Sequence, residues 1–206
     1  MLLLFYVIIM MKYLSLLIVF LLSTSFVTDK KNTANTKWII TEHSSLSVNG
    51  TTNVGRFSCA IDDYTKTDTV VIVHDKNDKI ILTGAINIKV SNFSCSNFMM
   101  TRELRKTLKA DQFPHLKVKF LSLKELDNLN QKVNKVCGNV EITIAGVSKR
   151  YEITYQLQLE KDTMTLIGVQ PIHFSDFNLV PPKKVGHLVR ANDKLSVIFN
   201  LNLRAI

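Results

Sequence analysis

The chain has 206 residues, of which 46% are hydrophobic and 21% charged, enough for one ordinary domain and a short additional segment. Its formal net charge is +9, but the cations are spread along the chain without a block of five or six. This distribution favours solubility and attraction to anionic surfaces over nucleic-acid binding. We therefore expect no nucleic-acid partner.

The additional segment is the N-terminus. Lys12 is the only charged residue before Asp29, and Leu14–Leu22 forms an apolar core that small polar residues follow. This order is typical of a secretory signal peptide. We predict a signal peptide at 1–27, a flexible segment at 28–36 and an exported mature chain that does not span a membrane. The alternative is a transmembrane anchor, for which the apolar run is long enough.

The folded part opens near Trp38 and shows mainly the period-two alternation of strands with one buried face. Asn49-Gly50 predicts a hairpin turn. Gly84, in the middle of an apolar alternation, predicts a bend or bulge. The alternation predicts about eight or nine strands, near residues 46–48, 54–61, 70–74, 80–90, 116–120, 136–144, 151–159, 164–174 and 194–203.

The clearest alternation lies in the centre of the chain. Val136–Ile144 and Tyr151–Leu159 each alternate apolar and polar residues, and Gly146 lies in the short link between them. This pattern predicts a β-hairpin. A two-stranded hairpin cannot bury its apolar face alone, so we expect more sheet to close over it.

One segment departs from the strand pattern. Met100, Leu104 and Leu108 are spaced by four among charged residues, which predicts an amphipathic helix of about three turns between Asn97 and Ala110, with Asn97 as its cap. Strands in meander order, a single helix and no internal repeat favour an all-β, mainly antiparallel, up-and-down barrel of about eight strands. A barrel of this size holds packed side chains or one small ligand. Inward-facing glycines predict some unfilled volume, namely Gly84, Gly138 and Gly168.

The three cysteines suggest one disulfide. Cys59 and Cys95 each lie near a strand end and follow a phenylalanine closely, so we predict that they pair in an oxidising compartment. Cys137 lies on the polar side of its strand and is then left over. The other pairings remain compatible with the sequence.

The residues that could support catalysis or metal binding show no recognised arrangement. None of the five histidines is three to five residues from another, and neither HExxH nor CxxC occurs. Ser44, His173 and Asp176 could form a triad on paper, but no G-x-S-x-G elbow supports it. No glycine-rich phosphate loop follows a strand. We therefore expect a protein that is not an enzyme and uses no metal or cofactor.

Four groups of residues, in the same order along the chain, resemble those of a known family. Trp38 and His43-Ser44 come first, and Met100–Leu108 is followed by Phe113-Pro114-His115 and Val118-Lys119-Phe120. Gly138–Lys149 resembles the signature G-x-L-T-I-x-G-V-T-K, and Asp176-Phe177-Asn178-Leu179 resembles a D-F-G/N-I segment. Together these residues resemble the YceI-like family over about residues 37–206.

The resemblance implies a lipocalin-like antiparallel barrel exported to the periplasm of Gram-negative bacteria. Members of this family can hold a long polyisoprenoid or another lipid chain in the lumen. We therefore expect non-enzymatic binding of an isoprenoid or acyl lipid, by burial of its chain. The alternative is a structural or stress-related cell-envelope protein with a filled barrel and a binding surface near Lys183-Lys184. A homodimer is compatible with the sequence.

The apolar alternation also predicts which residues face the lumen. Here the competing interpretation is that the same residues form a solid core. His43 and Arg56 are predicted at a mouth of the barrel, where a polar group can orient a ligand head group. The predicted lumen residues are Phe57, Leu82, Ile86, Ile88, Val118, Phe120, Val140, Ile142, Ile153 and Tyr155.

Overall fold

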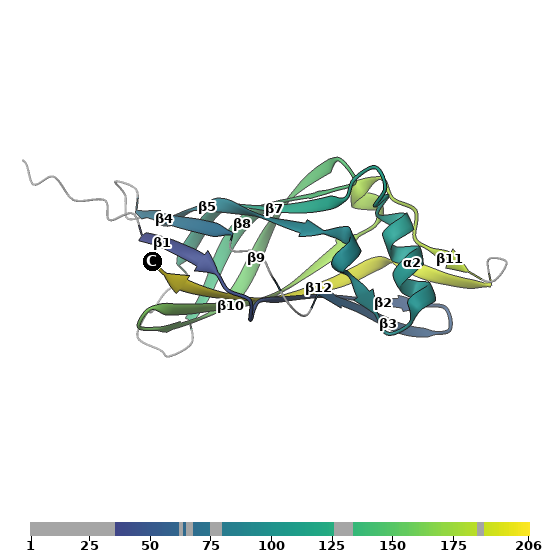
Figure 1. The fold of residues 1–206 in the computed structure, drawn as a ribbon, viewed down its shortest axis with the longest axis horizontal. Helices are drawn as coiled ribbons and strands as arrows, with labels where there is room; N and C mark the ends of the chain where they lie inside the picture. The colour runs from purple at the N-terminus through teal and green to yellow at the C-terminus, as the bar shows by residue number, and fades with distance from the viewer. Residues whose placement is uncertain (1–35, 62–63, 65–67, 75–79, 126–133, 185–187) are drawn as a thin grey trace, which may run out of the picture. The chain divides into compact units, whose positions relative to one another are not determined.

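The computed structural model describes residues 36–61, 64, 68–74, 80–125, 134–184 and 188–206 (Figure 1). The predicted signal peptide at 1–27 lies outside these residues. So does the predicted flexible segment at 28–36, apart from Thr36, where the first strand begins. Within the described residues, no helix is long and apolar enough to cross a membrane.

Strands make up most of the described chain, as the period-two pattern predicts. In chain order they are β1 (Thr36–Ile40), β2 (Ser45–Thr52), β3 (Gly55–Ile61), β4 (Thr69–His74), β5 (Ile80–Lys89), β6 (Ser94–Cys95), β7 (His115–Glu125), β8 (Asn134–Ile144), β9 (Val147–Glu160), β10 (Thr163–His173), β11 (Lys183–Lys184) and β12 (Val189–Ala205). The helices are η1 (Val90–Asn92), α2 (Phe98–Thr107) and η2 (Ser175–Phe177).

Eight of these strands close into an antiparallel barrel. Their order is β1-β4-β5-β7-β8-β9-β10-β12, and β12 pairs back with β1. The predicted all-β, lipocalin-like barrel with one amphipathic helix is confirmed. The central hairpin is confirmed as well, because β8 and β9 pair over their whole facing length, from Asn134 with Leu157 to Ile144 with Val147.

The strand order departs from the predicted meander at the hairpin of β2 and β3. β12 is 17 residues long and pairs with β2 along its first part and with β1 at its end. β2 and β3 therefore extend the sheet beyond the ring, and β3 continues to β6 instead of β4. The long final strand allows two separate segments to pair along its same edge.

The predicted turn at Asn49-Gly50 is wrong, because both residues lie inside β2. The hairpin turns instead between Thr52 and Gly55, where the Thr52 hydroxyl accepts a hydrogen bond from the Val54 N–H at 3.2 Å. A Cβ atom at Gly50 would lie 2.3 Å from the Phe57 ring. Glycine at this position leaves room for a cross-strand aromatic ring and does not mark a reversal.

Gly84 lies at an irregularity of the β5–β7 ladder, as predicted. The register shifts between Ile80 and Gly84, and a Cβ atom on Gly84 would lie 2.7 Å from the Thr69 carbonyl oxygen. The backbones of β4 and β5 therefore approach more closely than a side chain would permit.

The predicted helix and its cap are confirmed. The Asn97 side chain accepts a hydrogen bond from the Met100 N–H at 2.9 Å, which satisfies one of the free donors at the start of α2.

The predicted disulfide is confirmed and joins Cys59 on β3 to Cys95 on β6, directly before the helix. Arg105 then donates hydrogen bonds to the carbonyl oxygens of Ser91, at 2.5 Å, and Phe93, at 2.9 Å.

One end of the barrel, where β1 pairs with both β4 and β12, is filled by large side chains. We call this region the packed end. Its residues are at most 8% exposed, and they are Trp38, Val70, Leu82, Leu123, Val136, Leu157, Met164, Leu166 and Leu203. In Figure 1 it lies beside the C-terminus, and α2 lies at the opposite end.

Candidate functional site

The interior between these two ends contains two apolar chambers. The first has a volume of about 70 Å³ and lies next to the packed end. Inward-facing side chains of strands from all around the barrel form its wall. Its lining residues are Ile40, Ser44, Ser45, Leu46, Ile61, Tyr64, Ile86, Ile88, Val118, Phe120, Val140, Ile142, Ile153, Tyr155, Gln170, Val197, Phe199 and Leu201.

The second chamber has the same volume, about 70 Å³, and lies toward α2. Leu104 of the helix and its C-cap residue Leu108 line it, together with Phe177 and Leu179 of the segment around η2. Four residues line both chambers, so the two are adjacent sections of one apolar lumen. These shared residues are Leu46, Val118, Ile142 and Val197.

Most of the predicted lumen residues do face this cavity. Eight of the ten line the first chamber, and they are Ile86, Ile88, Val118, Phe120, Val140, Ile142, Ile153 and Tyr155. The other two do not line either chamber. Leu82 is buried in the packed end, and the Phe57 ring fills the space above Gly50.

The two predicted mouth residues lie apart from each other. The exposed His43 borders a surface depression that shares Ile40 and Tyr64 with the first chamber. The exposed Arg56 lies at a different depression, on the outer side of β2, β3 and β12 with Lys194. His43 is therefore near the lumen, whereas Arg56 is on an outer surface of the sheet.

The prediction of unfilled volume beside the glycines needs correction at all three positions. At Gly84 the Thr69 backbone occupies the space. A Cβ atom on Gly168 would lie 2.4 Å from the Phe199 ring, and one on Gly138 would lie 2.9 Å from the Tyr155 ring. The two rings themselves lie together, with centroids 5.2 Å apart. Aromatic rings of other strands occupy the space that these glycines leave, so the glycines shape the lumen and do not enlarge it.

The backbone ladder between β9 and β10 covers only part of the two strands. Their pairing extends from Glu160 and Thr163 to Tyr155 and Gly168, and beyond that point the described strands no longer pair with each other. β9 continues along β8, whereas β10 continues along β12. The half-buried Gln170 lies just past the last pair and lines the first chamber. The lumen therefore has a polar side chain where its backbone wall separates.

A hydrogen-bond network crosses this separation. Asp176, in η2, accepts hydrogen bonds from the Tyr151 hydroxyl of β9 at 3.0 Å and from the His173 N–H at 3.1 Å. The Tyr151 and Phe177 rings also lie 6.4 Å apart. Side chains and one short helical turn therefore connect β9 to β10 where the ladder does not.

The same network shifts the pKa values of its members. Partial burial would raise the pKa of Asp176, but the hydrogen bonds from the His173 backbone and from Tyr151, together with the nearby His173 side chain, hold it below its usual value. Burial and the hydrogen bond to Asp176 raise the pKa of Tyr151. At neutral pH, Asp176 is therefore an anionic acceptor and Tyr151 a neutral donor.

Two further tyrosines contribute polar atoms to the lumen. Tyr64 lines the first chamber and donates a hydrogen bond to Asp68, and its pKa is raised by burial and by that carboxylate. Tyr155 is 2% exposed, and burial, with a contribution from Cys137, raises its pKa. Both side chains stay neutral at physiological pH. The described lumen wall has hydroxyl, amide and imidazole groups and no carboxylate, lysine or arginine side chain.

His43-Ser44 forms the bend between β1 and β2. The buried Ser44 hydroxyl accepts a hydrogen bond from the Asn202 N–H at 2.9 Å, and the Asn202 side chain donates to the His43 carbonyl oxygen at 2.7 Å. Asn202 also accepts a hydrogen bond from Thr165 on β10, at 3.0 Å. These contacts hold the bend where β12 changes partner from β2 to β1.

The proposed triad residues are not assembled as a catalytic site. His173 Nδ1 lies 3.4 Å from Asp176, but Ser44 is hydrogen bonded to Asn202, which pairs with Thr165, eight residues before His173 along β10. Among the described residues, no group of three histidines, cysteines, aspartates or glutamates could hold a metal ion. Cys137 is buried and takes no part in the disulfide.

The sequence did not predict the second chamber. The sequence shows the apolar positions of α2 and the Asp176-Phe177-Asn178-Leu179 segment. Their patterns predict a helix and a family motif, but they do not indicate that the two segments line the same cavity. In the structure, Leu104, Leu108 and Phe177 close the lumen on this side. One signal could have located it. An amphipathic helix must bury its apolar face, and in a barrel with a single helix an open end of the barrel is a suitable place.

The chain is similar in structure to two solved proteins. The first is BcnA of Burkholderia cenocepacia, at 17% identity and a TM-score of 0.56, covering 77% of this chain and 95% of that one. The second is a polyisoprenoid-binding domain from Saccharophagus degradans, implicated in plant cell wall breakdown, at 12% identity and a TM-score of 0.53, covering 82% of this chain and 98% of that one.

A YceI protein of Campylobacter jejuni superposes at a TM-score of 0.48, with 19% identity, covering 66% of this chain and 80% of that one. No family model matches the chain, and no curated protein is similar to it in sequence. The resemblance to the YceI-like family is therefore confirmed at the level of the fold: the chain has the closed, lipocalin-like barrel with one helix that this resemblance predicts.

Proposed function

We propose that the protein is an exported, non-enzymatic binding protein that holds a long apolar lipid, a polyisoprenoid or an acyl chain, in the barrel lumen. The observation that carries this proposal is the pair of adjacent apolar chambers inside the barrel, which Ile142 and three other shared residues line. An apolar chain gains about 0.8 kcal/mol for each CH₂ group that it buries, so a few isoprene units suffice for useful affinity.

Two further observations support the proposal. A solved domain with the same fold is described as polyisoprenoid-binding. The disulfide between Cys59 and Cys95 is typical of proteins in oxidising compartments, as the predicted periplasmic or otherwise exported location requires. Hydroxyl and amide groups inside the lumen, at Tyr64, Tyr155 and Gln170, are suited to a neutral or weakly polar end of the lipid.

Binding of a long chain requires the lumen to widen. Each chamber has about 70 Å³, whereas ligand pockets usually have roughly 300–1,000 Å³. The widening has a structural route, because β9 and β10 stop pairing after Tyr155 and Gly168, and side chains connect them beyond that point. We infer that loading separates this part of the wall and joins the two chambers.

The small volume also favours a second candidate function. In it, the barrel is a filled scaffold, and the protein is a structural or stress-related partner in the cell envelope with a binding surface near Lys183-Lys184. Under this function the side chains around Ile142 form an ordinary core. Added lipid would then stay unbound.

Mass spectrometry of organic extracts separates the two functions. The mature protein would be exported in its native host and purified without detergent, and we expect a prenyl or acyl lipid in about stoichiometric amount. An extract free of lipid, from a protein that also refuses added lipid, would favour the filled scaffold. Turnover of an added lipid that stops on substitution of His43 or His173 would instead indicate an enzyme.

A matched pair of variants tests the location of the lipid. Ile142→Trp places a large ring where the two chambers meet, so it should abolish loading while the barrel stays folded, at a stability cost of about 1–3 kcal/mol. Gln156→Trp adds the same ring on the exposed side of β9 and should leave loading unchanged. Equal loading of both variants would contradict binding in the lumen.

A further inference from the structure

We propose that the α2 end of the barrel docks on the surface of an anionic lipid bilayer, from which the lumen receives its lipid or to which it delivers it. This inference rests on the proposed function, because a lipid carrier must exchange its ligand with a membrane. The surface combines exposed apolar side chains with cations. We call it the docking rim, and its apolar members are Val54, Phe98, Met99, Val180 and Leu188.

The apolar members are unusually exposed for their type. Phe98 is 78% exposed, Leu188 72%, Val180 71%, Val54 70% and Met99 50%. They lie in turns, at a helix start and in a connecting segment, not on the regular outer wall of the barrel. Apolar side chains that project from such positions can enter the interface of a bilayer without rearrangement of the fold.

Hydrogen bonds join the two chain segments that carry Val54 and Leu188. The Asn53 side chain donates a hydrogen bond to the Leu188 carbonyl oxygen at 2.8 Å, and the Asn53 N–H donates to the Arg190 carbonyl oxygen at 3.1 Å. The β2–β3 turn that carries Val54 is therefore fixed to the β11–β12 hairpin that carries Leu188. The two tips form one unit.

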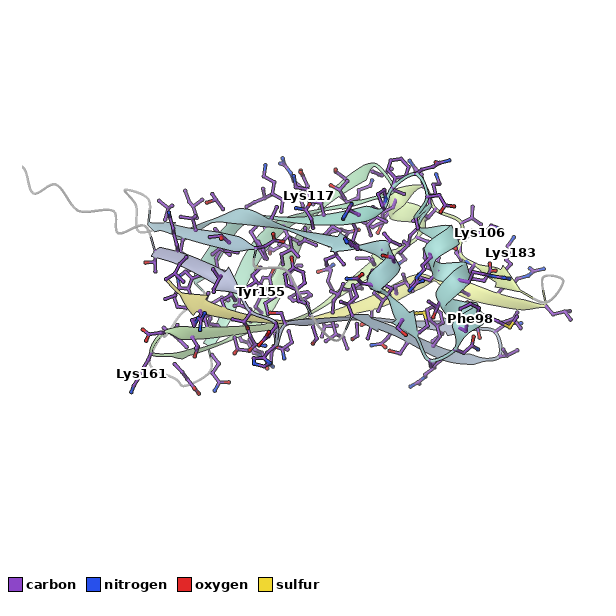
Figure 2. The ribbon with its side chains drawn as sticks, viewed as in Figure 1. Phe98, Lys106, Lys117, Tyr155, Lys161 and Lys183 are labelled. Atoms are coloured by element: carbon purple, nitrogen blue, oxygen red, sulfur yellow. A yellow bond between two sulfur atoms is a disulfide. The ribbon has the colours of Figure 1, made fainter. Side chains whose placement is uncertain are left out.

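The start of α2 is held on the same sheet. The disulfide between Cys59 and Cys95 and the hydrogen bond from the Ser96 N–H to the Ser58 carbonyl oxygen, at 3.2 Å, attach it to β3. Phe98 follows directly after the capping residue Asn97. Figure 2 shows Phe98 at the α2 end of the barrel together with Lys106 and Lys183, whereas Lys161 lies at the opposite end.

The charges at this end are mainly positive. The exposed cations are Arg56, Arg102, Lys106, Lys183 and Lys194. Three acidic groups, Glu103, Asp111 and Asp193, offset these five cations only in part. Asp193 also accepts a hydrogen bond from the Ser175 hydroxyl at 2.5 Å. Cations beside exposed apolar side chains match a surface of anionic phospholipids, which attracts each nearby lysine or arginine.

The docking rim and the second chamber belong to the same elements. Leu104 of α2 and its C-cap residue Leu108 line the chamber, while Phe98 and Met99 project outward at the start of the helix. In the segment after η2, Leu179 lines the chamber and the next residue, Val180, is exposed. A bilayer that takes up the outer side chains would therefore lie directly over the elements that cover the lumen.

The test is flotation of the mature protein with two kinds of vesicle. One kind is an equimolar mixture of phosphatidylglycerol and phosphatidylcholine, and the other is phosphatidylcholine alone. We expect binding to the mixed vesicles at least roughly tenfold stronger than to the neutral ones, and weaker in high salt, because salt screens the cations. Equal binding to both kinds, or none to the mixed vesicles, would overturn the proposal.

Matched variants locate the contact. Val54→Ser, Phe98→Ser and Leu188→Ser together should reduce binding to the mixed vesicles roughly tenfold or more. The control is Ile167→Ser with Val169→Ser, which removes two exposed apolar side chains from the outer wall of β10 and should leave binding unchanged. Equal binding of the rim variant and the control would overturn the assignment of this end.

Lipid in organic extracts, measured on the same variants, separates this proposal from the proposed function. A loaded barrel that does not bind mixed vesicles refutes docking and leaves the carrier function intact. Rim variants that bind vesicles normally but lose binding to a purified envelope protein would instead assign the rim to a protein partner, and would refute docking as well.

Discussion

The two ends of the barrel are closed by different kinds of interaction. At the packed end, β1 forms backbone ladders with both β4 and β12, and Trp38 and its neighbours fill the interior. At the α2 end, the β2–β3 hairpin leaves the ring, and a helix, a disulfide and the η2 segment provide the cover.

This difference indicates where the barrel can open. A continuous ladder with a close-packed interior opens only with much of the sheet, whereas a helix attached through side chains and one covalent bond can separate locally. The chambers are consistent with this division, because the second one lies toward α2 and is lined by its Leu104. We expect the α2 end to be the one that exchanges ligand.

The largest expected effect comes from emptying the packed end. Trp38→Ala removes a large ring that is 8% exposed and should reduce the free energy of unfolding by about 3–5 kcal/mol. Urea denaturation measures the loss. Trp38→Phe should reduce the free energy of unfolding clearly less than Trp38→Ala. It retains a ring and removes a buried indole N–H that has no partner among the described residues. Equal losses for both variants would contradict tight packing at this end.

The second effect comes from releasing the α2 end. Cys59→Ala with Cys95→Ala opens a link across 36 residues and should cost about 2–4 kcal/mol. Hydrogen exchange should accelerate in η1, β6 and α2 more than in β1 and β4. Uniform acceleration throughout the barrel would show that the two ends unfold as one unit, which would contradict the comparison.

The smallest effect concerns the network that connects β9 to β10. Tyr151→Phe removes the hydroxyl that donates to Asp176 and should cost about 1 kcal/mol at pH 7. Because the pKa of Asp176 is lowered in the folded protein, its stabilisation is present above the unfolded value of about 3.9 and is lost as the pH falls through the folded pKa. The difference between variant and wild type should therefore shrink in acid.

Denaturation curves at pH 7 and at acid pH measure this effect. Phe is the matched replacement because it retains the ring that lies 6.4 Å from Phe177. A difference that stayed constant with pH would show that the Asp176 carboxylate does not contribute to the bridge.

Sequence patterns were most reliable where one strand or one helix carries the signal. The alternation around Val140 and Ile153 located both strands of the central hairpin and the inward direction of their side chains. The spacing of Leu104 and Leu108 located the helix, and Asn97 located its N-cap. These signals are local, because backbone periodicity decides which side chains share a face.

The errors come from contacts between distant segments. Asn49-Gly50 has the sequence of a turn, but Gly50 lies in a strand because the Phe57 ring needs its space. Gly168 suggested an empty interior, but Phe199 fills it from the neighbouring strand. Arg56 was expected at the mouth, and the departure of β2 and β3 from the ring places it on an outer surface.

The all-β class, the helix and most of the residues that line the first chamber could be predicted from the sequence, because each follows from local alternation or spacing. The sequence favoured the Cys59–Cys95 pair without excluding the other pairings. Only the structure shows how β12 divides its edge between β1 and β2, where β9 and β10 stop pairing, and that Ile142 lies between two small chambers. These features depend on which distant strands meet and on how side chains share one interior volume, and no local pattern specifies either.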